Sequence, residues 1–463
     1  MIKDDTFKCR ELYAPAHFGN SYEAMYRTEA EDLLTEAKHW GFNTYSDWYD
    51  AADLRDPGNN PRRNYLLPQA LLDRKIEVFT IAVEHGFDTD LLITPNHVYI
   101  DQLRPDILAE AGDDRIFGQL ICPSKPAARE IILENHRYLF KRLAGAGVPL
   151  SFVSACPYDY GGCSCTSCNP WITAFGQLMK DIYEIAIESF PDVRPRLIGW
   201  WWTAEEHAVF REWADREAPG LFTGMFRHIK YGESVPDMSA PLPDGCAEGA
   251  FVHTGYPDIN KPPDVYGAWG PTAAHDRIPR TVAGLTDAGV DSFMAYSEGF
   301  FDDVNRAILA GIGSGQYTSS RDVLIAYAER YFGFSGSDAS GWAEWLTFWG
   351  RPFEAHIAEA RTLFNSLPRP EIPTWRYDQW EAKLELFEAH NSVTSSDTWD
   401  DTRIENATRF YSIREKLYRD IWRLGPVRHG INAESYPPPW AGEYEETVRA
   451  MGTENRGMSI DEA

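Results

Sequence analysis

Eight short strand-like runs alternate with helix-like segments between residues 11 and 315, and this alternation most constrains the fold. The runs lie at residues 11–18, 42–48, 89–98, 149–157, 194–202, 220–229, 249–256 and 291–299. Alternating βα units build parallel sheets, and eight parallel strands are the number that closes a barrel. The sequence therefore predicts an α/β fold with a (β/α)8 TIM barrel over residues 1–315.

Two of the intervening segments have clear helical spacing. Apolar residues share one helical face in each segment. They are Phe175, Leu178, Met179, Ile182, Ile185 and Ala186 in the first segment, and Ile132, Leu139, Phe140 and Leu143 in the second, where Gly145 offers a C-terminal stop. Residues 232–249, in contrast, have the composition of an irregular loop. We expect the two helices to wrap the barrel.

The pattern changes after residue 316, where strand-like runs stop and long helical patterns rich in Trp, Leu, Glu and Arg begin. Such patterns predict an α-helical C-terminal domain over residues 316–463. The last dozen residues are polar, so we expect them to form a loose tail.

Charge and cysteine content narrow the class of protein. The chain has 44 Lys plus Arg against 70 Asp plus Glu, a formal charge of -26, which disfavours nucleic acid and anionic membranes as partners. No export signal or long apolar segment is visible, and seven cysteines do not suggest a disulfide-dense scaffold. We expect a soluble, cytoplasmic, acidic protein, compatible with a homo-oligomer.

Functional side chains in such barrels stand at the C-terminal ends of the strands and on the loops that follow. Three carboxylates there are candidate catalytic residues: Asp159 after strand four, Glu205 after strand five and Glu298 after strand eight. Glycoside hydrolysis needs a pair of such groups. Glu205 follows Thr203 at a predicted helix start, so a capping role is as good an explanation for it.

The same rim carries polar and aromatic side chains suited to holding a sugar, whose apolar faces stack on aromatic rings. The chain contains 16 Trp, 23 Tyr and 24 Phe, although buried cores also consume aromatics. The candidate substrate-binding residues are Asp47, His97, Tyr158, Trp201, Trp202, Arg227, His253, Tyr256 and Tyr296.

Four cysteines lie close together just beyond strand four: Cys156, Cys163, Cys165 and Cys168. Four thiolates are the ligand set of a structural zinc site, which would hold the loop after strand four. A disulfide and free thiols are the alternatives, because the usual pair of C-x-x-C knuckles is absent and Cys156 belongs to a predicted strand.

Two segments carry a resemblance to known proteins. These are PYDYGGCSCTSCNPW at 157–171 and the stretch from YSEGFFDDVN to YAERYFG at 296–333. On these segments the chain resembles bacterial glycoside-hydrolase-like TIM barrels related to family 20 hexosaminidases and family 67 α-glucuronidases. The resemblance implies an enzyme that attacks a glycosidic bond at the barrel mouth. Family 20 enzymes place Glu after the strand-four Asp, whereas Tyr160 follows Asp159 here, which disfavours the substrate-assisted mechanism.

The sequence thus predicts a glycoside hydrolase acting on an oligosaccharide or polysaccharide, with Asp159 and Glu298 as acid and as nucleophile or base. No cofactor is expected for catalysis. Two alternatives remain. One is a metal-dependent sugar isomerase or epimerase, with ligands such as His17, His228 and Glu298. The other is a catalytically inactive carbohydrate-binding barrel.

Overall fold

The structure is a computed structural model. It describes residues 7–17, 19–49, 51, 61–110, 121–157, 162–199, 202–230, 242–255, 269–351, 356–424 and 437–454. Within these ranges the side chains of residues 61–68, 100, 230 and 452–454 are not described. Among these residues, no helix combines the length and apolarity that crossing a membrane requires.

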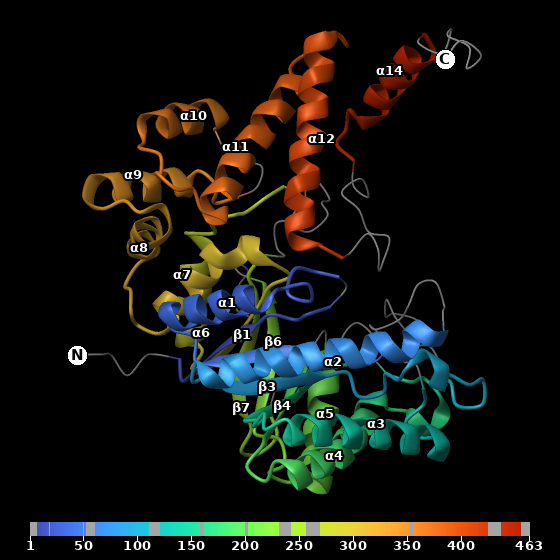
Figure 1. Cartoon of the computed structure of the whole chain (residues 1–463). Coiled ribbons are helices and arrows are strands. Elements are labelled where there is room, and N and C mark those ends of the chain that lie inside the picture. The colour runs from blue at the N-terminus through green and yellow to red at the C-terminus, as the bar shows by residue number, and fades with distance from the viewer. Residues whose placement is uncertain are drawn as a thin grey trace.

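Eight parallel strands close into a barrel in the order of the sequence, which confirms the predicted fold class (Figure 1). They are β1 (Cys9–Tyr13), β2 (Thr44–Tyr49), β3 (Asp88–Ile93), β4 (Phe152–Ala155), β5 (Arg194–Gly199), β6 (Gly224–Lys230), β7 (Ala247–His253) and β8 (Ser292–Tyr296). The barrel closes where β8 pairs with β1, with Tyr13 opposite Tyr296. Strands that are consecutive in the sequence are therefore neighbours in the barrel, and their C-terminal ends form one rim.

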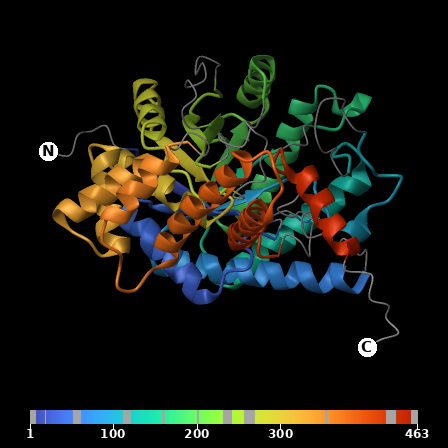
Figure 2. The same cartoon turned by 90° about the horizontal axis from the view of Figure 1, so that it is seen from above.

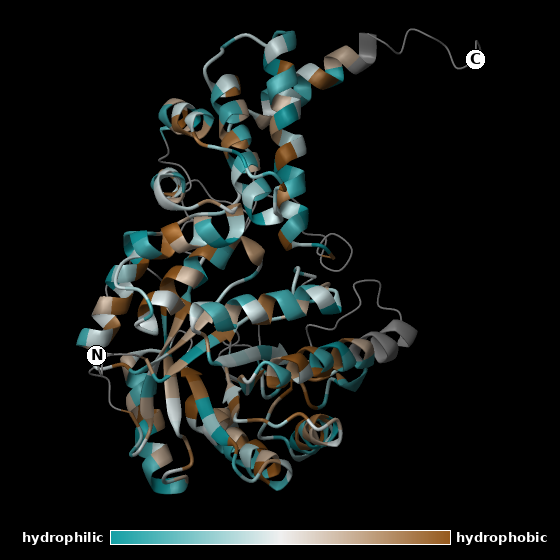
Figure 3. Ribbon diagram, turned by 60° about the vertical axis from the view of Figure 1, so that its left-hand side comes forward, coloured by the Kyte–Doolittle hydropathy of each residue, from teal (hydrophilic) through white to brown (hydrophobic). Residues whose placement is uncertain are grey.

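A layer of helices surrounds the strands, and Figure 2 shows the long helix α2 running along one edge of it. The barrel helices are α1 (Arg27–Trp40), α2 (Pro61–Glu84), α3 (Pro126–Gly145), α4 (Trp171–Ser189), α5 (Ala204–Glu217), α6 (Arg277–Asp287) and α7 (Asp303–Gly313), with 3-10 turns η1 (Ile100–Gln102), η3 (Thr166–Cys168) and η5 (Phe300–Asp302). All the apolar residues predicted to line α3 and α4 are buried. Figure 3 shows this alternation of apolar and polar positions along the helices.

The barrel interior is layered. Toward the N-terminal ends of the strands, Arg196 pairs with Glu11 (2.5 Å) and with Asp90. Above this charged layer lies an apolar cluster from all eight strands or their ends: Tyr13, Trp48, Leu92, Cys156, Ile198, Phe226, Phe251, Met294 and Tyr296. The interior is thus filled with side chains, as in other barrels of this size.

Helices continue after β8 and α7 and form a separate stack. They are α8 (Ser320–Phe332), α9 (Gly336–Thr347), α10 (Ile357–Ser366), α11 (Trp375–Thr394), α12 (Asp401–Ile421) and α14 (Ala441–Glu454). Their core contains the fully buried Trp342, Trp345, Trp349 and Trp380. A large part of the tryptophan excess therefore packs helices together rather than presenting rings to a ligand.

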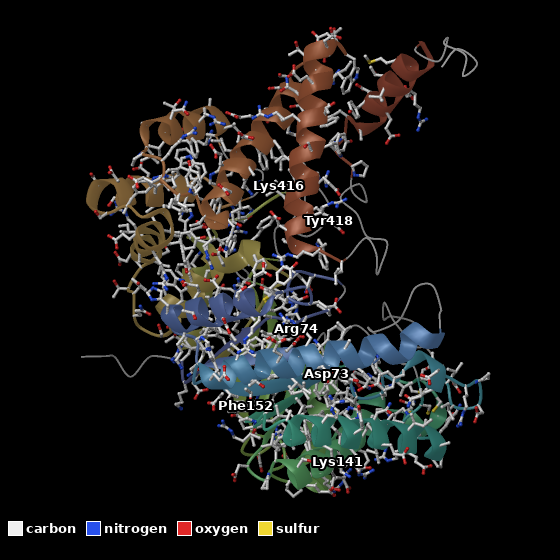
Figure 4. The ribbon with its side chains drawn as sticks, in the orientation of Figure 1. Asp73, Arg74, Lys141, Phe152, Lys416 and Tyr418 are labelled. Atoms are coloured by element: carbon white, nitrogen blue, oxygen red, sulfur yellow. The ribbon has the colours of Figure 1, made fainter. Side chains whose placement is uncertain are left out.

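The helical stack is anchored on the helices that follow β8 and β1. The Asp303 carboxylate of α7 accepts hydrogen bonds from Arg376 of α11 (2.6 Å) and from Tyr327 of α8 (3.0 Å). Just beyond α12, the two terminal N–H groups of Arg423 donate hydrogen bonds to the Glu29 carboxylate of α1, each at 2.8 Å. In Figure 4, Lys416 and Tyr418 mark α12 above Asp73 and Arg74 on α2. The C-terminal helices are therefore bound to the barrel through buried and half-buried charges.

Candidate active site

Glu298 follows β8 at the C-terminal rim and is 4% exposed. Its Oε2 lies 2.8 Å from His17 Nε2 and accepts a hydrogen bond from Asn20 Nδ2 at 3.3 Å. Oε1 accepts no hydrogen bond from a residue that the structure describes. One carboxylate oxygen is therefore anchored, while the other is left to interact with a ligand or with a neighbour outside the described residues.

The loop after β1 is braced so that His17 and Asn20 meet Glu298. Asn20 Nδ2 also donates to the carbonyl of Pro15 at 2.7 Å, and the Asn20 amide donates to the His17 carbonyl at 2.9 Å. The Glu23 carboxylate accepts the Gly19 amide at 2.7 Å. Since these groups are buried, the loop has little freedom, and the two donors are held in place before any ligand arrives.

The segment that carries Glu298 is fixed from its other side. Tyr22 donates to the Gly299 carbonyl at 3.0 Å, and Ser297 Oγ donates to the same carbonyl at 2.8 Å. A Cβ placed on Gly299 would lie 2.9 Å from Ile421 Cγ2 of α12, and the Leu424 amide donates to the Gly19 carbonyl at 2.8 Å. The C-terminal helices thus press directly on both loops of the site.

Aromatic rings and two histidines line the interior next to this carboxylate. The His17 ring packs edge-to-face on Trp48, with 4.9 Å between centroids, and Tyr13 lies 5.5 Å from Tyr296. The His253 ring contacts the rings of Tyr296 and His228, with 4.5 Å between ring centroids in each case. Burial, with a smaller contribution from nearby acidic groups, holds the pKa of Tyr13 well above its usual range, so Tyr13 stays a hydroxyl donor. The arrangement combines stacking surfaces with hydrogen-bonding groups.

Glu298, His253 and Tyr296 are the predicted site residues that the structure brings together. His97 is buried in the loop after β3, where its amide donates to the Thr94 carbonyl at 3.3 Å. Glu205 is exposed in the first turn of α5. The adjacent Glu206 forms the capping box with Thr203 that this segment predicts.

Three predicted substrate contacts lie elsewhere. Asp47 faces away from the barrel interior and pairs with Lys75 of α2 at 3.0 Å. Arg227 pairs with Glu248 at 2.6 Å, and Trp202 packs against aromatic rings of α4 and α5. Because successive residues of a strand face opposite sides, the inward neighbours of Asp47 and Arg227 occupy the interior instead. We therefore leave these three residues out of the site.

Four other predicted site residues, Asp159, Tyr158, Trp201 and Tyr256, lie outside the described residues, so their roles stay predictions. Sequence reasoning grouped His17 with Glu298 only as possible metal ligands and did not predict that His17 and Asn20 hold the Glu298 carboxylate. The signal was available, since β1 and β8 are neighbours in any closed barrel of eight consecutive strands. It also missed Tyr13 and Trp48, which occupy the inward positions of β1 and β2.

The cysteine cluster differs from the predicted set in one member. The sulfurs of Cys122, Cys163, Cys165 and Cys168 lie within 4.8 Å of one another. Cys156 belongs to the apolar interior of the barrel, because it continues the inward face of β4. Cys122, which is 41 positions before Cys163, takes its place from the loop before α3. Among the described residues, this cysteine cluster is the group in which three or more His, Cys, Asp or Glu side chains could hold a metal ion. The described residues at the barrel mouth therefore offer no such group for the isomerase alternative.

No protein-family model matches the sequence, and no curated protein matches it. Several solved structures are similar. One is CpGH84B, at 13% identity and a TM-score of 0.44, over 95% of this chain and 77% of that one. Another is a GH138 enzyme targeting pectin rhamnogalacturonan II, at 10% identity and a TM-score of 0.48, over 92% of this chain and 58% of that one. Both of these structures are glycoside hydrolases.

The O-GlcNAc hydrolase of Thermobaculum terrenum, solved in a mutant form, is similar to the same extent. Its identity is 11% and its TM-score 0.46, over 90% of this chain and 82% of that one. At such identities the likeness concerns the fold alone. The case for a function rests on the residues around Glu298.

Proposed function

We propose that this protein is a glycoside hydrolase in which Glu298 and Asp159 act on a glycosidic bond at the barrel mouth. The observation that carries the proposal is the state of Glu298: buried at a strand's C-terminal end, held through Oε2 by His17 and Asn20, and surrounded by aromatic rings. A carboxylate that accepts two hydrogen bonds is suited to act as nucleophile or base.

The position of Asp159 along the chain supports its role as the partner. It comes four positions after β4 ends, and β4 lies opposite β8 in the closed order of eight strands. Loops that begin on opposite sides of a barrel mouth can place two carboxylates on either side of a bound sugar. Glycosidases separate such groups by roughly 5–10 Å, depending on the stereochemical outcome.

The chemistry then follows from these two positions. The bond between the anomeric carbon and the glycosidic oxygen breaks, and the oxygen takes a proton from Asp159. Glu298 either bonds to the anomeric carbon, to be displaced later by water, or takes a proton from a water that attacks this carbon. In the first case Asp159 takes a proton from the displacing water and so returns to its protonated form. In the second case Glu298 releases its proton to solvent and Asp159 regains one from solvent, and one water is consumed in either case. Trp48, Tyr13 and Tyr296 are buried, so they support Glu298 from the barrel interior rather than face the sugar.

The test combines two variants and a matched control. Glu298→Gln and Asp159→Asn keep size and shape but remove the charge, and Glu184→Gln makes the same change on the exposed face of α4. Hydrolysis of a panel of aryl glycosides and oligosaccharides should fall by roughly 10²–10⁴-fold in each site variant and not in the control. Retained hydrolysis in both site variants would refute the assignment, and so would binding without hydrolysis by the wild-type protein.

A further inference from the structure

We propose that Cys122, Cys163, Cys165 and Cys168 bind one zinc ion, which ties the loop before α3 to the loop before α4. The four sulfurs come from two segments far apart in the sequence and lie within 4.8 Å of one another. Cys122, Cys163 and Cys168 are at most 2% exposed. Such convergence of buried thiols has few explanations besides a disulfide or a metal.

The distances between the sulfur atoms favour a metal. Cys122 Sγ lies 3.7 Å from Cys165 Sγ and 3.6 Å from Cys168 Sγ. Zinc binds thiolates at about 2.3 Å in a tetrahedron, whose edge is then about 3.8 Å. A disulfide joins its sulfurs at about 2.05 Å, and none of the seven cysteines forms one. The spacing matches the edge of a ZnS4 tetrahedron.

The surrounding groups hold the sulfurs in these positions. The Glu110 amide donates to Cys163 Sγ at 3.4 Å, and Ser124 Oγ lies 3.0 Å from Cys168 Sγ. Hydrogen bonds of this kind orient metal-bound thiolates and offset their charge. The main chain is also tied, because the Cys122 amide donates to Ile107 and the Ser164 amide to Glu110.

The composition of the cluster favours zinc over other ions. Four sulfur ligands in a tetrahedral arrangement select zinc or iron, not the oxygen-seeking calcium or magnesium. A cluster with two irons spreads its cysteines over both metals, whereas a spread of 4.8 Å suits a single ion. A single zinc ion needs no redox partner, and its thiolate site is stable in a reducing compartment.

The site has a consequence for the loop that carries Asp159. Cys163 follows Asp159 by four positions, so an ion at the cluster fixes one end of the segment 159–163. Glycine is required at position 162, because a Cβ there would lie only 2.2 Å from Trp171 Cβ and would clash with it. This consequence rests on the proposed function, but metal binding itself does not.

Metal analysis of the full chain, expressed with zinc in the medium and purified without chelator, tests the inference. We expect about one zinc ion per chain, and clear loss of it in Cys122→Ser and Cys165→Ser. Cys246→Ser, outside the cluster, is the matched control and should keep the metal. Replacement by Co²⁺ should give the thiolate-to-cobalt absorption of a tetrahedral S4 site, which does not depend on activity.

Thermal unfolding adds a second measurement. Removing zinc with a chelator should lower the unfolding temperature by more than about 5 °C, and adding Zn²⁺ should restore it. Wild-type protein without zinc, or with iron and visible colour, would overturn the assignment; so would Cys122→Ser with full zinc content. Zinc with no hydrolysis would instead count against the proposed function alone.

Discussion

His17 Nε2 lies 2.8 Å from Glu298 Oε2, although 281 positions separate the two residues. The contact exists because β8 pairs with β1 when the barrel closes, which brings the loops after the first and last strands together. Both side chains are buried, so their interaction is sheltered from solvent. It couples closure of the fold to the geometry of the candidate site.

His17→Gln should lower turnover by roughly 10–100-fold while leaving substrate affinity nearly unchanged. The variant loses the imidazole that positions Glu298 but keeps the carboxylate itself. His356→Gln, on an exposed histidine next to α10, is the control. Unchanged turnover in His17→Gln would show that His17 does not position Glu298.

Gly299→Ala should impair both stability and activity, because the new Cβ would lie within 3.0 Å of both γ-carbons of Ile421. We expect a loss of about 1–3 kcal/mol in stability and a fall in turnover, since Glu298 is the adjacent residue. Shortening Ile421 to alanine removes the clashing atoms. In the double variant the two changes should therefore be less damaging than their sum, by about 1 kcal/mol or more. Purely additive effects on the urea midpoint would contradict the close contact.

Arg196→Met should destabilise the barrel by about 3–5 kcal/mol at pH 7, because it strands Glu11 and Asp90 without a counter-charge. Burial already raises the pKa of Glu11 in the wild-type chain, with Arg196 opposing that rise. Protonation of Glu11 should make the variant's loss of stability smaller in acid. Arg216→Met removes an exposed pair with Glu217 and should change the urea midpoint little. Equal midpoints for the two variants would argue against a buried charge layer.

His136 should make stability depend on pH. It is buried in α3, with Nδ1 2.8 Å from the Ile132 carbonyl, and burial lowers its pKa from 6.5 to about 4. Between pH 6.5 and 4, His136 binds a proton in the unfolded chain but not in the folded chain. The contribution of His136 to the free energy of unfolding is therefore fully present above pH 6.5. It is lost as the pH falls toward 4, by up to about 3 kcal/mol. In His136→Gln the urea midpoint should fall less between pH 7 and 4.5. The same fall in both proteins would contradict the shift.

Much of the fold was predictable because its signals are local. The apolar faces of α3 and α4 and the helix start after Thr203 appear in the structure as expected. The site was harder to predict. Position at a strand end selected Glu298 and His253, but it also selected Asp47, which faces α2. A shift of one residue along a strand reverses the side that a side chain faces, and residue type alone does not reveal the register.

The sequence by itself determined the eight strands, most of the barrel helices and the helical segments after them, because periodicity and capping act over a few neighbouring residues. Tertiary structure alone decided which distant groups meet: His17 with Glu298, Ile421 with Gly299, and Cys122 with the C-x-C-x-x-C loop. The physical reason is that such contacts depend on barrel closure and helix packing, which bring together segments that carry no mark of one another in the chain.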